Sequence, residues 1–127
     1  MLRTMVEINL FKFAPDAYEV APGEALFREG ESGDTMFAVV EGRVEVTIGG
    51  QVVEQVGPGG VLGELALIDA APRAATATAA VTSRIVSIDK RHFTFLVQEH
   101  PTFALQVMAV MAERLRSANV NHALSPE

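Results

Sequence analysis

Residues 63–79 read GELALIDAAPRAATATA: a glycine, a carboxylate, a short apolar turn and a lone arginine followed by small residues. The glycines Gly57, Gly59 and Gly60 come just before this stretch. Glycine allows close approach to the backbone, and the planar guanidinium of arginine matches the geometry of an oxyanion. The stretch therefore predicts an anion-binding loop, around which the rest of the chain is arranged.

Arg73 is the residue expected to hold the anion, because it is the only basic residue between Arg43 and Arg84. In a site sheltered from water, a charge-assisted hydrogen bond contributes about 1.5–3 kcal/mol. One arginine is therefore sufficient for a chain of net charge −6 to bind a small anion.

The apolar residues 65–68 can form one helical turn that opens at Gly63 and Glu64. The N–H groups of Leu65 and Ala66 would then be free to point at the same anion. Since a carboxylate repels an anion, Glu64 is expected to accept hydrogen bonds from a ligand hydroxyl. Alone, the turn or the arginine is typical of ordinary surface structure; together they predict a binding site.

Short strands separated by turns surround this loop. We count eight between Tyr18 and Asp89, which favours an eight-stranded, jelly-roll-like β-roll over about residues 17–89. Gly49–Gly50 indicates a hairpin, since both central residues of the favoured turn need positive φ. A two-residue turn would set Ile48 opposite Gln51 and Val46 opposite Val53. The hydrophobic pattern alone does not settle this register.

Two helices are expected after the β-roll, over about residues 90–119, so the fold is mainly β with C-terminal α. Asp89 can cap the first helix, and His100–Pro101 ends it because proline pushes the preceding residue out of the α region. The second helix has a wide apolar stripe, which packs on the β-core or forms a homodimer through residues 101–118. The stripe consists of Phe103, Leu105, Val107, Met108, Val110, Met111, Ala112 and Leu115. Residues 1–14 are expected to be a short N-terminal helical segment that packs on the rest.

The length of 127 residues fits a single domain, residues 1–127. An acidic chain with two lysines gives no support for DNA binding, and the pairs Lys90–Arg91 and Arg114–Arg116 are typical of solvated helix faces. No apolar run approaches the roughly 20 residues of a membrane helix, and the first residues do not read as a signal peptide. We therefore expect a cytoplasmic protein without a membrane span.

An enzyme of the cupin type shares the β-roll architecture and is the alternative from another functional class. Such an enzyme holds its metal with histidines on strands, whereas His92, His100 and His122 all lie in the expected helical tail. The chain has no cysteine, and no serine is accompanied by a histidine and an aspartate that would make it a nucleophile. We therefore predict no catalytic residue, no metal site and no cofactor.

The order GELALI, proline–arginine, AAT closely resembles the phosphate-binding cassette of the cyclic nucleotide-binding domain family. The similarity continues upstream through FREGESGDTMFAVVEGRVEV, residues 27–46, which is similar to the family's strand–turn–strand segment. The family occurs in cAMP-dependent protein kinase regulatory subunits, catabolite-activator-like regulators and cyclic-nucleotide-gated channels. The resemblance implies a sensor that binds cAMP, or else cGMP; the alternative is an interaction module that has lost nucleotide binding.

The resemblance also implies a role for each residue of the site. Glu64 binds the ribose 2′-OH, Gly63 makes room for the sugar, and Arg73 binds an exocyclic phosphate oxygen. Backbone N–H groups of Leu65, Ala66 and Ala74 face the phosphate, and Ala75 is the next residue of the same binding loop. An apolar wall for the purine is formed by Val46, Val61 and Leu62. Relatives that prefer cGMP often have Ser or Thr at the position of Ala74, so the alanine favours cAMP.

Ligand binding is expected to move the C-terminal helices. Leu67, facing away from the ligand, would shift against the first helix, and the helix over residues 101–118 would close over the purine. Three residues are in range to cap the purine: Asn119, Asn121 and Leu124. Too few residues follow for a helix-turn-helix, a kinase-inhibitor segment or a channel. The sequence therefore predicts a stand-alone sensor domain, or a fragment of a longer protein, that acts on a downstream protein partner.

Overall fold

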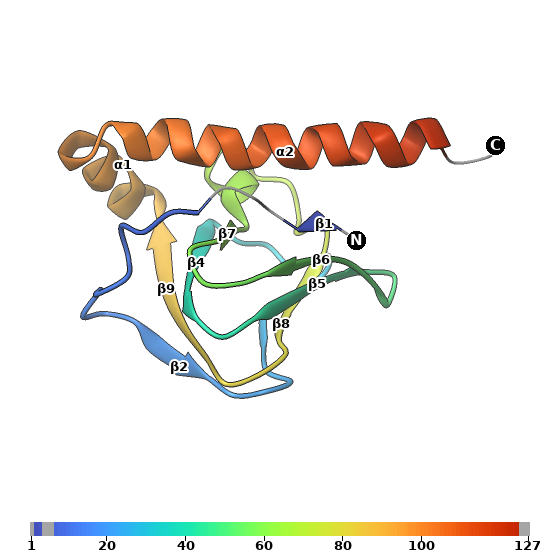
Figure 1. The fold of residues 1–127 in the computed structure, drawn as a ribbon, viewed down its shortest axis with the longest axis horizontal. Helices are drawn as coiled ribbons and strands as arrows, with labels where there is room; N and C mark the ends of the chain where they lie inside the picture. Colours follow the sequence, from blue (N-terminus) through green and yellow to red (C-terminus); the bar gives the residue numbers. More distant parts are fainter. Residues whose placement is uncertain (1, 4–6, 125–127) are drawn as a thin grey trace.

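The structure, a computed structural model, describes residues 2–3 and 7–124, with side chains for 7–118. Two β-sheets face each other, and two helices lie across one end of them (Figure 1). The strands are β1 (Leu2–Arg3), β2 (Tyr18–Val20), β3 (Ala25–Phe27), β4 (Thr35–Glu41), β5 (Val44–Ile48), β6 (Gln51–Val56), β7 (Val61–Leu62), β8 (Thr76–Ala79) and β9 (Ser83–Asp89). The helices are the 3₁₀ helix η1 (Glu64–Leu67), α1 (Lys90–Glu99) and α2 (Thr102–Leu124). The expected β-roll followed by two helices is confirmed, with β2–β9 as its eight strands.

The strands form one sheet in the order β1-β6-β5-β8-β3 and a second in the order β2-β9-β4-β7. The hairpin predicted at Gly49–Gly50 joins β5 to β6, and both glycines have positive φ, 59° and 82°. The pairing of Ile48 with Gln51 is confirmed. Turn chemistry therefore fixes the end of this hairpin, because residues other than glycine rarely adopt two successive positive φ angles.

A β-bulge changes the register further along the same hairpin. Val46 pairs with Glu54, so the pairing of Val46 with Val53 that an unbroken hairpin would give does not occur. Unbroken pairing would set Glu45 opposite Glu54, and like charges in that position are destabilising. The extra residue in β6 avoids this repulsion and turns the Glu54 side chain to the same face as Val46.

The core has two parts because β4 is buried on both faces. Phe37 and Val39 point between the two sheets, whereas Met36 and Ala38 point towards the helices. Successive side chains of a strand face opposite ways, so a strand covered on both sides reads as a continuous apolar run. This explains why residues 36–40 show no alternation in the sequence.

The ends of α1 lie where the sequence predicts them. The Asp89 side chain accepts a hydrogen bond from the His92 N–H at 2.8 Å, which caps the first turn. The helix ends at Glu99, before His100 and Pro101. By contrast, α2 extends to Leu124, further than the expected end near residue 119.

The apolar residues of α2 divide into two faces. Phe103, Val107 and Val110 are buried in the core, with exposures of 1%, 4% and 0%. Leu105, Met108 and Leu115 lie on the other face and stay exposed, at 64%, 50% and 64%. One part of the wide stripe therefore packs on the β-core as expected, and the other part is uncovered.

The N-terminal segment packs on the helices, but its described residues do not form the expected helix. Residues 10–13 form a turn with i→i+3 hydrogen bonds from Lys12 to Asn9 and from Ala14 to Phe11. Pro15 and the irregular apolar spacing explain why no longer helix forms. The ring of Phe11 meets Phe103 edge-on, with the centroids 5.6 Å apart, so the segment is part of the core beneath α2.

We expect Phe103→Ala to lower the free energy of unfolding by about 3–5 kcal/mol, because it empties a fully buried site shared by α2 and the N-terminal turn. The matched control is Phe95→Ala on α1, where the ring is 55% exposed and the expected change is within about 1 kcal/mol. Denaturant unfolding measures both. Equal losses for the two variants would contradict the packing described for Phe103.

Candidate functional site

A cavity of about 270 Å³ opens beside η1, between the β5–β6 hairpin and α2. Its lining brings together η1 and the loop after it, strands of both sheets and a single residue of α2. The lining residues are Phe27, Val46, Glu54, Leu62, Gly63, Glu64, Leu65, Ala66, Asp69, Ala71, Pro72, Arg73, Ala74, Ala75 and Arg114. It is mostly apolar with a few charged groups, as is usual for a small-molecule site.

Nine of the ten predicted site residues line this cavity, and Val61 does not. The Val61 side chain is fully buried in the core cluster that faces the helices. Its expected place in the purine wall is therefore wrong, because its neighbour Leu62 points to the other face of the same short strand. Only the backbone carbonyl of Val61 takes part in the site, as an acceptor for Arg114.

The helical turn predicted after Gly63 is present as a 3₁₀ helix. Gly63 has φ 76°, a left-handed conformation that favours glycine, and its carbonyl accepts a hydrogen bond from the Ala66 N–H at 3.2 Å. The expectation that the Ala66 N–H is free to face a ligand is therefore wrong for this structure. Leu67 packs against the core cluster shared with the helices, on the side away from the cavity, as predicted.

Arg73 reaches the cavity from the loop that follows η1. Its guanidinium donates through Nη2 to the carbonyl of Thr35 at 2.7 Å and through Nη1 to the carbonyl of Gly63 at 3.3 Å. Burial lowers the pKa of Arg73, while the nearby carboxylates of Asp34 and Glu31 act in the opposite direction. An arginine guanidinium remains protonated in proteins, so the cavity contains a cation suited to an anion.

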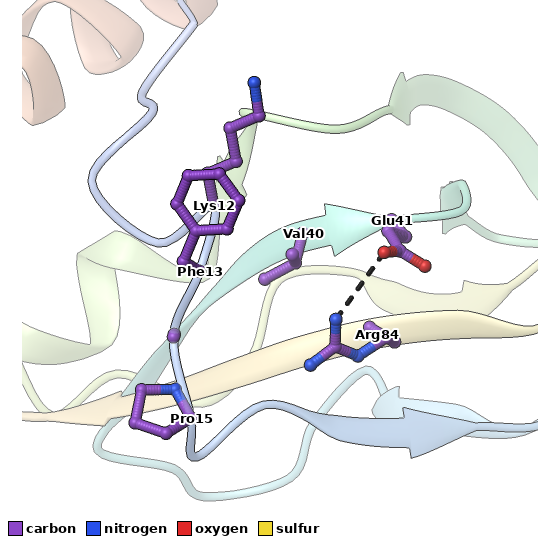
Figure 2. A pocket seen from close by; sticks show the side chains of 7 residues that line it. Lys12, Phe13, Pro15, Val40, Glu41 and Arg84 are labelled. Carbon is purple, nitrogen blue, oxygen red and sulfur yellow. Dashed lines mark ion pairs between the residues drawn. The ribbon is translucent and has the colours of Figure 1, made fainter.

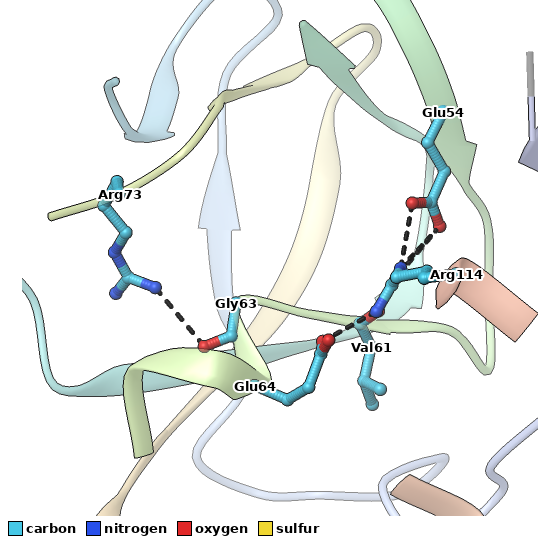
Figure 3. A network of polar contacts seen from close by, with 6 residues as sticks. All are labelled: Glu54, Val61, Gly63, Glu64, Arg73 and Arg114. Atoms are coloured by element: carbon cyan, nitrogen blue, oxygen red, sulfur yellow. Dashed lines mark hydrogen bonds and ion pairs between the residues drawn. The ribbon is translucent and has the colours of Figure 1, made fainter. Parts of the chain in front are cut away.

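Arg114 enters the cavity from α2 and is not the solvated residue that the sequence predicted. Its Nη1 donates to Glu64 Oε1 at 2.6 Å, while Nη2 donates to Glu54 Oε2 at 2.7 Å and to the Val61 carbonyl at 2.6 Å (Figure 3). A further bond joins Nε to Glu54 Oε1 at 2.9 Å. Both carboxylates are nearly buried, with side-chain exposures of 8% for Glu54 and 6% for Glu64.

Electrostatics at Arg114 favour its charged form. Burial opposes the charge, but the hydrogen bonds and negative charges of Glu54 and Glu64 raise the pKa of Arg114 above its ordinary value. One cation thus serves two carboxylates from different elements, β6 and η1. Breaking a buried ion pair by removing one partner typically costs about 3–5 kcal/mol, so this contact strongly constrains where α2 lies.

Sequence reasoning missed both Glu54 and Arg114 as site residues. One signal was available for Glu54: it lies two residues before the buried Val56, in a position that alternation in β6 turns inward. A carboxylate at an inward position needs a partner. No local sequence pattern would have identified Arg114 as a site residue, because its partners lie 50 and 60 residues away in the sequence.

A second hollow, of about 500 Å³, lies between the N-terminal turn and β4 (Figure 2). An ion pair at this hollow joins Arg84 Nη1 to Glu41 Oε1 at 3.5 Å, with side-chain exposures of 41% and 66%. Ion pairs this exposed contribute little, and none of the charged residues described at this hollow is buried. The cavity beside η1 is therefore the better candidate site.

Within residues 2–3 and 7–124, no group of three metal-binding side chains lies together, and no helix is long and apolar enough to cross a bilayer. The predicted purine caps Asn119, Asn121 and Leu124 belong to a part of α2 whose side chains lie outside the description.

Comparison with known proteins places these features in a family. Residues 18–100 match the sequence profile described as "Cyclic nucleotide-binding domain". The chain is similar to a CRP-like cAMP-activated global transcriptional regulator of Mycobacterium tuberculosis, with 31% identity over 106 residues. That match covers 80% of this chain and 47% of the relative, so the chain spans about half the length of the curated relative.

Solved structures agree with the sequence matches. The catabolite activator protein of Thermus thermophilus superimposes with a TM-score of 0.75 and 27% identity, over 86% of this chain and 54% of the other. A protein from a cyclic-GMP-dependent signalling pathway that regulates bacterial phytopathogenesis has a TM-score of 0.65 and 32% identity, over 94% of both chains. Because its sequence matches the family profile and its fold and relatives agree with that match, the chain belongs to the cyclic nucleotide-binding domain family.

Proposed function

We propose that this chain is a single-domain sensor, residues 1–127, that binds cAMP in the cavity beside η1 and reports binding through its C-terminal helices. The observation that carries the proposal is that Arg73 and Glu64 line one cavity, with a cation and a carboxylate available to the same ligand. A cyclic nucleotide needs both a cation and a carboxylate, because its cyclic phosphate is an anion and the ribose fused to it has a free 2′-hydroxyl.

The phosphate is assigned to Arg73 and the ribose to Glu64. Each terminal nitrogen of Arg73 has a second N–H beyond the one given to a backbone carbonyl, and these can donate to an exocyclic oxygen. Arg114 donates to Oε1 of Glu64, so Oε2 can accept from the 2′-OH. The N–H groups of Leu65 and Ala74 are proposed to complete the phosphate site.

The purine is proposed to lie against Val46 and Leu62, which give an apolar wall without a strong demand on base identity. Ala74 supplies no hydroxyl for a guanine, and the mycobacterial relative is cAMP-activated, so we propose cAMP. The alternative is cGMP, since the protein that matches over 94% of both chains belongs to a cyclic-GMP-dependent pathway.

Coupling to α2 is proposed to run through Arg114. A ribose hydroxyl bound to Glu64 changes the charge and the hydrogen bonds around the carboxylate that Arg114 also holds. A ligand can move the helix only by the difference in its affinity for the two helix positions. The same reciprocity means that a downstream partner that holds α2 in one position changes the affinity for nucleotide.

The role is proposed to be binding and not catalysis, acting in the cytoplasm, without direct contact to DNA. The fold and family are those of regulatory domains, which supports this reading over a cupin-type enzyme. An interaction module of the same fold without nucleotide binding remains the second candidate, and the titration below separates the two.

Arg73→Ala is expected to weaken cAMP binding by about 2–4 kcal/mol, roughly 30- to 1,000-fold, because the charge-assisted bonds to phosphate are lost. Isothermal titration calorimetry with cAMP and with cGMP measures the unchanged protein and the variant. Arg84→Ala, at the exposed pair with Glu41, is the matched control and should leave affinity unchanged.

An unchanged dissociation constant in Arg73→Ala would refute the assignment of the phosphate. Absence of heat and of any thermal shift with both nucleotides in the unchanged protein would instead support the interaction module.

We further propose a homodimer through the uncovered face of α2, because Leu105, Met108 and Leu115 recur along it at helical spacing. Sedimentation equilibrium is expected to give a dimer for the unchanged protein and a monomer for Leu105→Glu combined with Leu115→Glu. Ile48→Glu, in the β5–β6 hairpin at 48% exposure, should stay dimeric. A monomeric unchanged protein would contradict the proposal.

A further inference from the structure

The backbone of Arg73 is tied to a turn that lies about 40 residues earlier in the sequence. The N–H of Arg73 donates to the carbonyl of Glu31 at 2.8 Å, and the N–H of Gly30 donates to the carbonyl of Arg73 at 2.8 Å. These two bonds bring the segment before β4, which includes Gly33, directly against the arginine.

The ring of Phe27 lies under the guanidinium. The Arg73 Cζ atom is 4.3 Å from the ring centroid, well within the range of a cation–π interaction. Phe27 in turn stacks on Phe37, with centroids 5.8 Å apart and the rings inclined by 28°. The guanidinium is therefore held on an aromatic surface that is itself packed into the core.

Gly33 leaves the space that the guanidinium occupies. A Cβ atom added at this position would lie 2.6 Å from Nε and 2.6 Å from Nη2 of Arg73, closer than real Cβ atoms approach other atoms. Gly33 does not have a left-handed φ, so its backbone would accept an alanine. The three atoms nearest to such a Cβ all belong to the Arg73 guanidinium, so the arginine accounts for the glycine here.

The same arrangement decides which N–H groups of Arg73 can reach a ligand. Nε is buried without a hydrogen-bond partner, and Nη2 and Nη1 each give one N–H to the carbonyls of Thr35 and Gly63. A guanidinium has five N–H donors. Without the buried Nε–H and the two N–H groups bonded to carbonyls, two are left for a ligand, one on each terminal nitrogen. An anion in the cavity would meet the end of the guanidinium and not the side that includes Nε.

We propose that Phe27 and Gly33 are positioning residues for Arg73, which keep its guanidinium in an end-on orientation before any ligand arrives. The effect of these two residues on nucleotide affinity rests on the proposed function, whereas their effect on the orientation of Arg73 does not. A side chain held in its binding orientation loses less conformational entropy on binding, which is how the two residues act on affinity.

The first test uses the ligand-free protein. In a ¹⁵N-detected NMR experiment, the Arg73 Nε–H signal should show slow solvent exchange and a shift caused by the Phe27 ring. Gly33→Ala and Phe27→Leu should each move this signal and speed its exchange. Gly57→Ala is the matched control, because a Cβ there meets nothing within 4 Å and its φ is not left-handed. An unmoved Arg73 signal in Gly33→Ala overturns the proposal, whether or not the protein binds nucleotide.

The second test is a double-mutant cycle read by calorimetry with cAMP, or with cGMP if that is the nucleotide bound. Gly33→Ala should weaken binding about tenfold or more, the loss of one charge-assisted bond, while Gly57→Ala leaves it unchanged. In the Arg73→Ala background, Gly33→Ala should have no further effect, since no guanidinium is left to displace.

Equal weakening by Gly33→Ala with and without Arg73 would mean a general distortion of the site and would overturn the positioning role. If the unchanged protein binds neither nucleotide, the proposed function fails, and the NMR result alone decides whether Gly33 and Phe27 position the arginine.

Discussion

The guanidinium of Arg114 joins three elements that are far apart in the sequence: α2, β6 and η1. Two nearly buried carboxylates share this one cation, and each would be an unpaired buried charge without it. The position of α2 over the cavity and the orientation of Glu64 depend on this contact, and the bulge in β6 turns Glu54 towards it. It is the point at which the helices meet the candidate binding site.

The two arginines of the cavity have different surroundings and therefore different capacities. Arg114 has most of its donors engaged by carboxylates, so little of its charge is left for a ligand. Arg73 is bonded to neutral backbone carbonyls and stacked on Phe27, so its charge is not cancelled by a direct ion pair among the described contacts. The first suits a structural junction and the second suits an anion.

The parts of the site that sequence could predict are those encoded locally. Gly63, Glu64 and Arg73 lie in one short loop, and their residue types and order indicated the chemistry before any fold was known. The strands and the cap of α1 followed from turn residues and alternation in the same way. Long-range contacts were not accessible: Arg114 looked like a solvated helix residue because nothing near it in sequence reveals Glu54 or Glu64. The bulge and the inward side chain of Val61 likewise depend on pairing across strands.

We propose above all that ligand binding in the cavity changes the position and the amide exchange of α2 through the contacts of Arg114. Hydrogen–deuterium exchange with and without saturating cAMP tests it most directly. Slower amide exchange in α1 and α2, over residues 90–118, is the expected result, with β2 (Tyr18–Val20) unchanged as the internal reference. Exchange in residues 90–118 that is identical with and without bound nucleotide would contradict the coupling.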